Sequence, residues 1–154
     1  MLFGCGGDRD KGKRSKMGKI ADKYADKIYL TDDNPRHERP KKIRDEIKRG
    51  IKKSQIVEIS NRKEAIIKAI NNLNTGNILI VAGKGHEKIQ QIGNRKVFLS
   101  DRQIISSSIK KRNFKLSKNL KLNILNERFD QNILPFKSVI NKASINSKLS
   151  LIHI

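Results

Sequence analysis

The feature that most constrains the fold of this chain is its most apolar run, residues 78–82 (ILIVA). Five consecutive apolar residues, most of them β-branched, are typical of a central parallel strand that is covered on both faces. The run leads directly into the polar loop GKGHE at residues 83–87. The sequence therefore predicts a parallel sheet with a polar loop at a strand end.

Strand-like and helix-like segments alternate along the first 112 residues. Further short strands are expected at residues 1–3, 27–30, 55–59 and 96–99. Apolar residues recur at helical spacing between them, which predicts helices over about 16–25, 40–50, 61–73 and from 101 onward. This alternation predicts an α/β domain with a Rossmann-like, doubly wound, mostly parallel sheet.

Helix starts are marked by capping residues. Ser15 is expected to cap the first helix, so that its core-facing positions would be Met17, Ile20, Ala21 and Tyr24. Pro40 suits the first turn of the second helix. Either Ser60 or Asn61 is expected to cap the third helix, and Asp101 the last one.

Past residue 112 the composition changes. Residues 113–154 are rich in Asn, Lys and Ser, with scattered Leu and Ile. Such a segment buries little apolar surface. We therefore expect one domain over residues 1–112 and a poorly structured extension over 113–154, made of a linker and an incomplete second unit. Because the chain opens at the end of a strand, we also expect the domain to be a fragment.

The charge of the chain is strongly positive. Its 35 Lys and Arg outnumber 15 Asp and Glu, which gives a formal net charge of +20. That balance raises a nucleic-acid or polyanion-binding module as an alternative. The basic residues are spread over the whole chain, however, and the few aromatics are not interleaved with them as base stacking requires. We therefore do not expect nucleic acid as the partner.

Cysteine usage and hydropathy indicate the compartment. Cys5 is the only cysteine, which fits a reducing cytoplasm. No apolar run is long enough for a transmembrane helix, and the start MLFGCGG is too short and too rich in glycine for a secretory signal. We expect a cytoplasmic protein without membrane contact.

Three polar loops follow strand ends. They are loop one, residues 4–14 (GCGGDRDKGKR), loop two, residues 31–39 (TDDNPRHER), and loop three, residues 83–87 (GKGHE). Because the carboxyl ends of parallel strands meet at one edge of a sheet, we expect the three loops to converge there.

Loop one carries only part of a phosphate-binding pattern. From Gly7 to Gly12 and Lys13 the spacing of a P-loop is present, but Arg14 stands where Ser or Thr is required. The loop also lacks the third glycine of a dinucleotide fingerprint. A generic nucleotide-binding α/β domain thus stays open as a further alternative, with weak support.

Loops two and three offer complementary chemistry. Pro35 restrains Asn34 before it, so Asn34 and Arg36 can hold a carboxylate. The local rules alone favour a plain turn with an exposed arginine. Gly83 offers a carbonyl and Glu87 can bind an ammonium group. With Arg9 from loop one, the loops suit a zwitterionic amino-acid centre.

Two further residues of loop three are candidates for a supporting role. His86 could orient Glu87 or titrate near neutral pH, and Lys84 lies beside it in sequence. No metal site is expected, because a single His-Glu pair has too few ligands.

The loop sequences GCGGDRDKGKR, TDDNPR and VAGKGHE, in this order and at these intervals, resemble the C-terminal domain of the UDP-N-acetylmuramoyl-tripeptide synthetases, which are Mur ligases. The resemblance runs from residue 1 to about 111. It implies an ATP-dependent ligase of peptidoglycan synthesis. The DNPR of loop two resembles members that add meso-diaminopimelate to UDP-MurNAc-L-Ala-D-Glu.

The resemblance implies a binding site for meso-diaminopimelate made of Arg9, Asp33, Asn34, Pro35, Arg36, Gly83 and Glu87. Arg36 and Asn34, helped by Arg9, would hold the distal carboxylate. Gly83 and Glu87 would hold the distal ammonium group. The family places ATP, Mg²⁺ and UDP binding mostly in upstream domains, so we expect no ligase activity from this chain alone.

Two segments complete the comparison with the family. Ser15 stands where the family usually has Pro, and either residue can start a helix. Residues 140–148 (INKASINSK) weakly resemble the start of the D-Ala-D-Ala-adding Mur ligase. A second ligase that begins there, or a disordered extension, would account for the tail.

Overall fold

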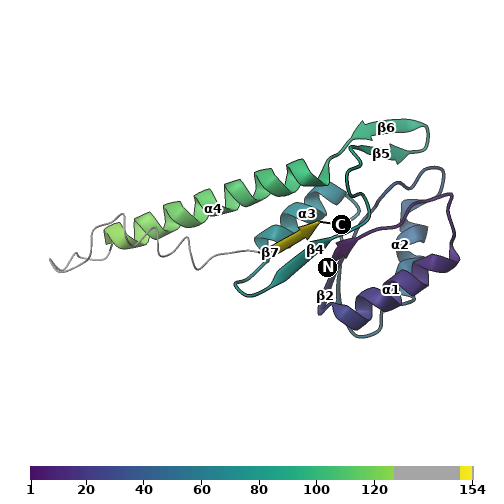
Figure 1. Ribbon diagram of the computed structural model, residues 1–154, viewed down its shortest axis with the longest axis horizontal. Helices are drawn as coiled ribbons and strands as arrows, with labels where there is room; N and C mark the ends of the chain where they lie inside the picture. The colour runs from purple at the N-terminus through teal and green to yellow at the C-terminus, as the bar shows by residue number, and fades with distance from the viewer. Residues whose placement is uncertain (127–149, 154) are drawn as a thin grey trace.

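The computed structural model describes residues 1–126 and 150–153 (Figure 1). Its main sheet has the strand order β3-β2-β1-β4-β7 and is parallel throughout. The strands are β1 (Leu2–Phe3), β2 (Lys27–Leu30), β3 (Gln55–Glu58), β4 (Ile78–Val81) and β7 (Ser150–His153). The α/β class and the parallel sheet are therefore confirmed.

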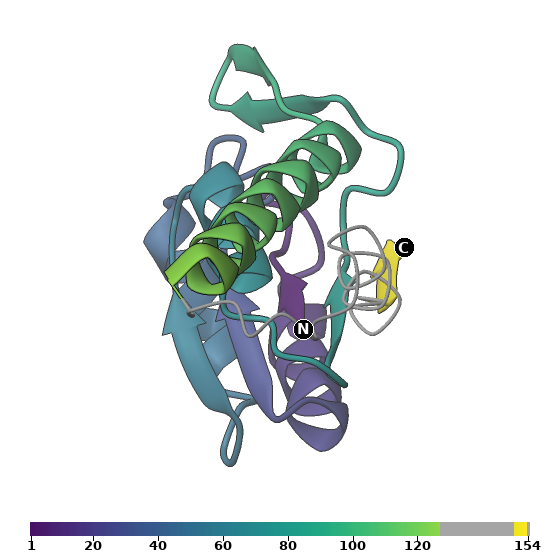
Figure 2. The same cartoon turned by 90° about the vertical axis from the view of Figure 1, so that its left-hand side faces the viewer.

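Helices cover both faces of the sheet, α1 (Gly12–Tyr24) and α2 (Pro40–Lys48) on one and α3 (Arg62–Asn71) and α4 (Asp101–Asn126) on the other (Figures 1 and 2). Strand side chains alternate between two cores. Leu2 packs with α3 and α4, whereas Phe3 packs with α1 and α2. This alternation is the period-two geometry of a strand, and it makes the fold doubly wound.

The first helix differs from its sequence prediction. It begins at Gly12, so Ser15 lies within the helix and is not its cap. Ile20 and Tyr24 are 59 % and 75 % exposed, so the expected apolar stripe is wrong at these two positions, whereas Ala21 is buried as predicted. The buried face also contains Gly18. A Cβ on Gly18 would lie 2.2 Å from the carbonyl oxygen of Ile47, so this tight contact with α2 admits only a small residue.

The second and third helices follow the prediction closely. Pro40 stands at the start of α2, and Ile43 and Ile47 form the buried face of this helix. The side chain of Asn61 accepts a hydrogen bond from the backbone N–H of Glu64, so Asn61 caps α3. The expected apolar residues of α3 all belong to one core: Ala65, Ile66, Ala69, Ile70 and Leu73.

A β-hairpin follows loop three. The strands β5 (Ile89–Ile92) and β6 (Arg95–Phe98) pair antiparallel as a separate sheet. The sequence predicted a strand at 96–99 but missed β5, whose sequence IQQI has little apolar content. A recognisable signal was the Gly93-Asn94 pair between two short runs, which is typical of a two-residue hairpin turn.

The last helix extends beyond the boundary that composition placed at residue 112. Asp101 is its first residue rather than the predicted cap, and α4 continues to Asn126. Ile105 is buried against α3, whereas Phe114 is 70 % exposed, since the far half of the helix projects from the sheet (Figure 1). Residues 113–126 are therefore helical. The segment 140–148 lies outside the described residues.

Candidate functional site

The candidate site lies where the strand order reverses. Strand β1 pairs with β2 on one side and with β4 on the other, and the carboxyl ends of all three lie at one edge. Loops one, two and three leave from this edge, as the sequence predicted. Doubly wound sheets bind ligands at such a switch point.

Glycines allow loop one to pack directly on loop two. A Cβ on Gly4 would lie 2.2 Å from the carbonyl oxygen of Thr31, and one on Gly7 would lie 1.9 Å from that of Pro35. The backbone N–H of Gly7 donates to the carbonyl oxygen of Asn34 at 2.8 Å. Loop two therefore takes its position from backbone contacts that any larger residue would block.

Arg36 is held by two neighbouring segments. Its φ of 49° is unusual for a residue other than glycine. Its backbone N–H donates to Gln91 at 3.1 Å, its carbonyl oxygen accepts from Gly93 at 2.6 Å, and its Nη1 donates to the carbonyl oxygen of Gly7 at 2.6 Å. The β5–β6 hairpin and loop one thus position the guanidinium beside a cavity of about 440 Å³, which Asn34 and Glu87 also line.

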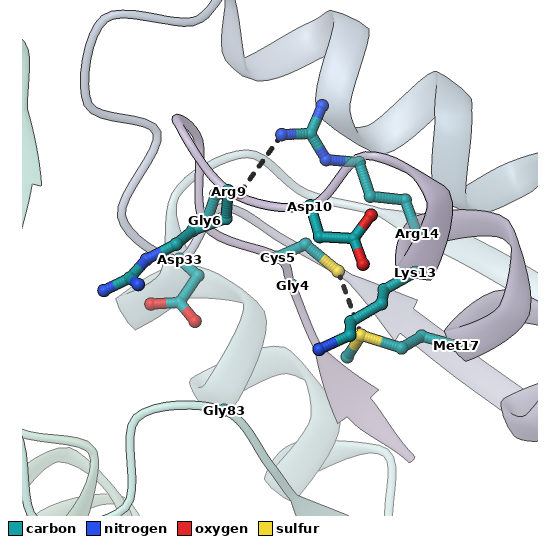
Figure 3. Close-up of a pocket in the computed structure, with 10 residues that line it drawn as sticks. All are labelled: Gly4, Cys5, Gly6, Arg9, Asp10, Lys13, Arg14, Met17, Asp33 and Gly83. Carbon is teal, nitrogen blue, oxygen red and sulfur yellow. Dashed lines mark hydrogen bonds between the residues drawn. The ribbon is translucent and has the colours of Figure 1, made fainter.

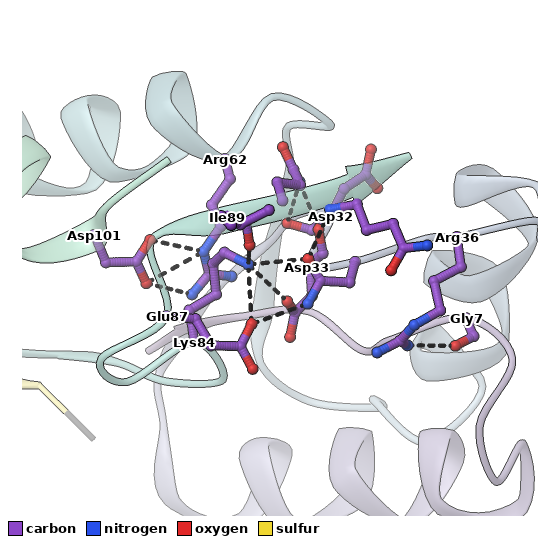
Figure 4. A network of polar contacts seen from close by, with 12 residues as sticks. Gly7, Asp32, Asp33, Arg36, Arg62, Lys84, Glu87, Ile89 and Asp101 are labelled. Carbon is purple, nitrogen blue, oxygen red and sulfur yellow. Dashed lines mark hydrogen bonds and ion pairs between the residues drawn. The ribbon is translucent and has the colours of Figure 1, made fainter. Parts of the chain in front are cut away.

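Lys84 is the centre of the polar network (Figure 4). Its side chain is fully buried, and its ammonium group donates to the side-chain oxygen of Asn34 at 3.0 Å and to the carbonyl oxygen of Ile89 at 2.7 Å. The carboxylates of Asp33 and Glu87 lie 3.5 Å and 3.4 Å away. The sequence suggested only a supporting role for Lys84, because burial of its side chain depends on tertiary contacts.

Asn34 connects Lys84 to Glu87. Its Nδ2 donates to Glu87 Oε2 at 3.0 Å, while its Oδ1 accepts from Lys84 and from the backbone N–H of Gln91. Partial burial raises the pKa of Glu87, but the Asn34 hydrogen bond and the Lys84 charge outweigh it and lower that pKa. Glu87 is therefore a carboxylate ready to accept a cation.

Asp33 faces a second cavity, of about 450 Å³, at the switch point (Figure 3). Gly83 and Arg9 line the same cavity. Burial raises the pKa of Asp33, and the charges of Arg62 and Lys84 oppose that rise. Gly83 has a φ of 115°, and a Cβ there would lie 3.1 Å from Asp33 Oδ2, so a side chain at this position would be both strained and crowded.

The remaining predicted residues lie near these cavities. Pro35 is buried against loop one, and Arg9 is exposed at the rim of its cavity. His86 is exposed and lines the cavity of Arg36 and Glu87. Asn34 and Lys84 hold Glu87, which is the orienting role that the sequence suggested for His86.

Two glutamines of β5 belong to the site and were missed. The side chain of Gln90 donates to the carbonyl oxygen of Asp33 at 2.5 Å. The backbone of Gln91 binds both Asn34 and Arg36. Prediction of the hairpin from its Gly93-Asn94 turn would have placed both glutamines in a strand directly after loop three, but not against loop two.

Arg14 has a structural role. Its side chain is 1 % exposed and forms ion pairs with Glu38 and Glu46. It therefore joins α1 to loop two and α2. In the sequence it is one of several basic residues of loop one, and nothing nearby marks its burial.

Known proteins share this architecture. Residues 1–85 match the family described as Mur ligase, glutamate ligase domain. The chain belongs to the Mur ligase family. A solved UDP-N-acetylmuramoyl-L-alanyl-D-glutamate–2,6-diaminopimelate ligase superposes with a TM-score of 0.69 at 39 % identity, over 73 % of this chain and 23 % of that one.

Curated relatives of this Mur ligase domain carry the same name. The ligase of Rickettsia rickettsii is 57 % identical over 110 residues, which are 71 % of this chain and 23 % of the relative. That of Buchnera aphidicola is 51 % identical over 73 % of this chain and 22 % of the relative. The chain thus spans about a quarter of the length of these ligases.

Within residues 1–126 and 150–153, no helix is both long enough and apolar enough to cross a bilayer.

Proposed function

We propose that this chain is the amino-acid-binding domain of a ligase that adds meso-diaminopimelate to UDP-MurNAc-L-Ala-D-Glu in cytoplasmic peptidoglycan precursor synthesis. The observation that carries the proposal is the charge arrangement around Lys84. The Arg36 guanidinium and the Glu87 carboxylate line one cavity and are held by separate contacts. The names of the relatives support the choice of amino acid.

The distal end of meso-diaminopimelate carries a carboxylate and an ammonium group on one carbon. Arg36 binds the carboxylate, because a guanidinium can donate two parallel hydrogen bonds to it. Asn34 uses one amide N–H for Glu87 and has a second for the ligand. Glu87, which lines the same cavity as Arg36, accepts the ammonium group. Gly83, Arg9 and Asp33 line the second cavity.

Selectivity follows from the group that lysine lacks. Lysine has the distal ammonium but no distal carboxylate, so its binding leaves Arg36 without an anionic partner in a partly enclosed cavity. An unpaired donor in a site that is built to bind an anion costs binding free energy.

ATP and Mg²⁺ belong, in this proposal, to other domains of the parent ligase. ATP supplies the phosphoryl group that activates the carboxyl of D-glutamate. The residues present here do not fit a phosphate loop, because Arg14 replaces the Ser or Thr and is buried in ion pairs. The chain itself binds the distal end of the amino acid, whose other amine reacts, and we expect no amide formation by it alone.

Calorimetric titration of the chain with meso-diaminopimelate and with L-lysine tests the proposal. We expect saturable binding of meso-diaminopimelate and at least about tenfold weaker binding of lysine, since a charge-assisted hydrogen-bond pair is lost. Arg36→Ala should remove this preference. Arg39→Ala is the matched control, as Arg39 lies in the same loop and is exposed. Equal affinity for both amino acids, or an unchanged preference in Arg36→Ala, would contradict the assignment.

The second candidate function is polyanion binding, which the net charge of +20 favours. Titration with single-stranded and duplex nucleic acid at two salt concentrations distinguishes polyanion binding from amino-acid binding. Affinity that falls steeply with salt and is unchanged in Arg36→Ala would favour the polyanion. Weak binding at all salt concentrations would favour the amino-acid site.

A further inference from the structure

His37 bridges two segments that are far apart in the sequence. Its Nδ1 lies 2.9 Å from Asp8 Oδ2 in loop one, and its Nε2 lies 3.2 Å from Asn94 Oδ1 in the β5–β6 turn. The backbone N–H of His37 also donates to Asp8 Oδ2 at 3.4 Å. One exposed imidazole thus joins loop one to the hairpin across loop two.

The same two segments hold the preceding residue. Arg36 donates to Gly7 in loop one and exchanges backbone hydrogen bonds with Gln91 and Gly93 in the hairpin. Gly93 is adjacent to Asn94, and Gly7 is adjacent to Asp8. Each contact of His37 therefore reinforces a contact that orients the Arg36 guanidinium.

Both partners of the imidazole are acceptors. A carboxylate has no proton to donate, and the amide oxygen of Asn94 faces Nε2. The bridge is complete when both ring nitrogens carry a proton, that is, when the ring is charged. The hydrogen bond that the ring donates to Asp8, and then the one that it donates to Asn94, raise the pKa of His37 above its ordinary value of 6.5. Asp8 is the charged group that acts on the ring, and the neighbouring Glu38 is committed to Arg14.

We propose that His37 is a positioning residue of the amino-acid site. In its charged form it ties loop one to the β5–β6 turn, and it thereby holds Arg36 in the orientation that binds the distal carboxylate. The effect on ligand binding rests on the proposed function, whereas the bridge itself does not. Because the charged ring is the bridging form, binding should weaken as the pH rises through the pKa of His37.

NMR titration of the imidazole nitrogens in the whole chain tests the bridge independently of any ligand. We expect a His37 pKa above 6.5 that falls in Asp8→Asn and in Asn94→Ala. Asn74→Ala is the matched control, because Asn74 lies in another exposed turn. An ordinary His37 pKa that none of the variants changes would overturn the bridge.

Ligand binding then tests the positioning role. In His37→Gln, affinity for meso-diaminopimelate should fall about three- to fivefold at about pH 6, which is the size expected for an exposed ion pair. The wild type and His37→Gln should converge at a pH well above the His37 pKa found by NMR, where the ring is neutral. Asn94→Asp, which offers the ring a second carboxylate, should bind at least as tightly as the wild type. Equal binding by His37→Gln and wild type at both pH values would overturn the proposal.

The two experiments distinguish a failure of the positioning role of His37 from a failure of the proposed function. If the wild type binds no meso-diaminopimelate, the proposed function fails. Amide hydrogen exchange then tests whether His37 joins loop one to the hairpin. Faster exchange at Gly93 in His37→Gln would then support the bridge, because the N–H of Gly93 donates to Arg36. Unchanged exchange would refute it.

Discussion

At the scale of single residues, Lys84 decides the charge balance of the site. A buried ammonium group lies between two carboxylates and an amide, and each of them faces a cavity. Because the attraction between charges is stronger away from water, Lys84 holds Asp33 and Glu87 close together where they would otherwise repel each other.

Replacement of Lys84 by Met tests this role. The apolar chain length is kept, but the partners of the ammonium group are left without a donor, so we expect the free energy of unfolding to fall by about 2–3 kcal/mol. Urea denaturation measures the change, and Lys88→Met, at an exposed position nearby, serves as the control. Identical urea midpoints for Lys84→Met and the wild type would show that the contacts of Lys84 do not stabilise the fold.

At the scale of elements, the site depends on how closely loops and helices approach. Loop one lies against loop two because Gly4 and Gly7 have no side chain. The starts of α3 and α4 are joined by Arg62 and Asp101, both fully buried, whose closest contact is 2.7 Å. These contacts position loop two and the helix that follows the hairpin.

Gly7→Ala should separate loops one and two. The added Cβ would lie 1.9 Å from the carbonyl oxygen of Pro35, so the backbone must shift. We expect a loss of about 1–3 kcal/mol in unfolding free energy, together with weaker meso-diaminopimelate binding. Gly12→Ala is the control, because its Cβ would meet only the end of the Asp10 side chain at 3.2 Å. The prediction fails if the two variants behave alike in urea denaturation and in calorimetry.

Asp101→Asn should destabilise the α3–α4 contact. Loss of one charge leaves the Arg62 guanidinium buried without its counter-ion, which typically costs about 3–5 kcal/mol. The double variant Arg62→Met, Asp101→Leu should recover much of this loss, because neither charge then remains buried. Thermal and urea unfolding of the three proteins measure the effect. A double variant no more stable than Asp101→Asn would point to a role beyond the pair.

At the scale of the whole molecule, acid should weaken the fold through Glu38. Its hydrogen bond with the Arg14 guanidinium lowers the pKa of Glu38 from 4.5 to about 2. A lowered pKa in the folded state contributes stability above the unfolded value, and that stability is lost as the pH falls from 4.5 through about 2. The urea concentration at the unfolding midpoint should therefore decrease as the pH is lowered through this range, and it should decrease less in Glu38→Gln. An equal decline in both proteins would rule out Glu38 as a main cause.

Much of this fold could be predicted from local features of the sequence. The apolar run at residues 78–82, the cap at Asn61 and the proline at residue 40 depend on neighbours a few positions away, and each predicted its element. The convergence of the three loops also followed, since parallel strands end at one edge. Of the apolar stripe predicted for α1, Ala21 is buried but Ile20 is not, because the helix packs on the backbone of α2, where Gly18 gives the close contact.

The sequence by itself determined the α/β class, the order of the elements over residues 1–112 except β5, and the three polar loops, since periodicity and loop motifs are local properties of the chain. Only the tertiary structure decided which charges lie inside. Arg14 and Lys84 look like any other basic residues in a chain with a net charge of +20, yet both are buried in ion pairs. Their burial depends on carboxylates that reach them from other elements, and no local pattern encodes that approach.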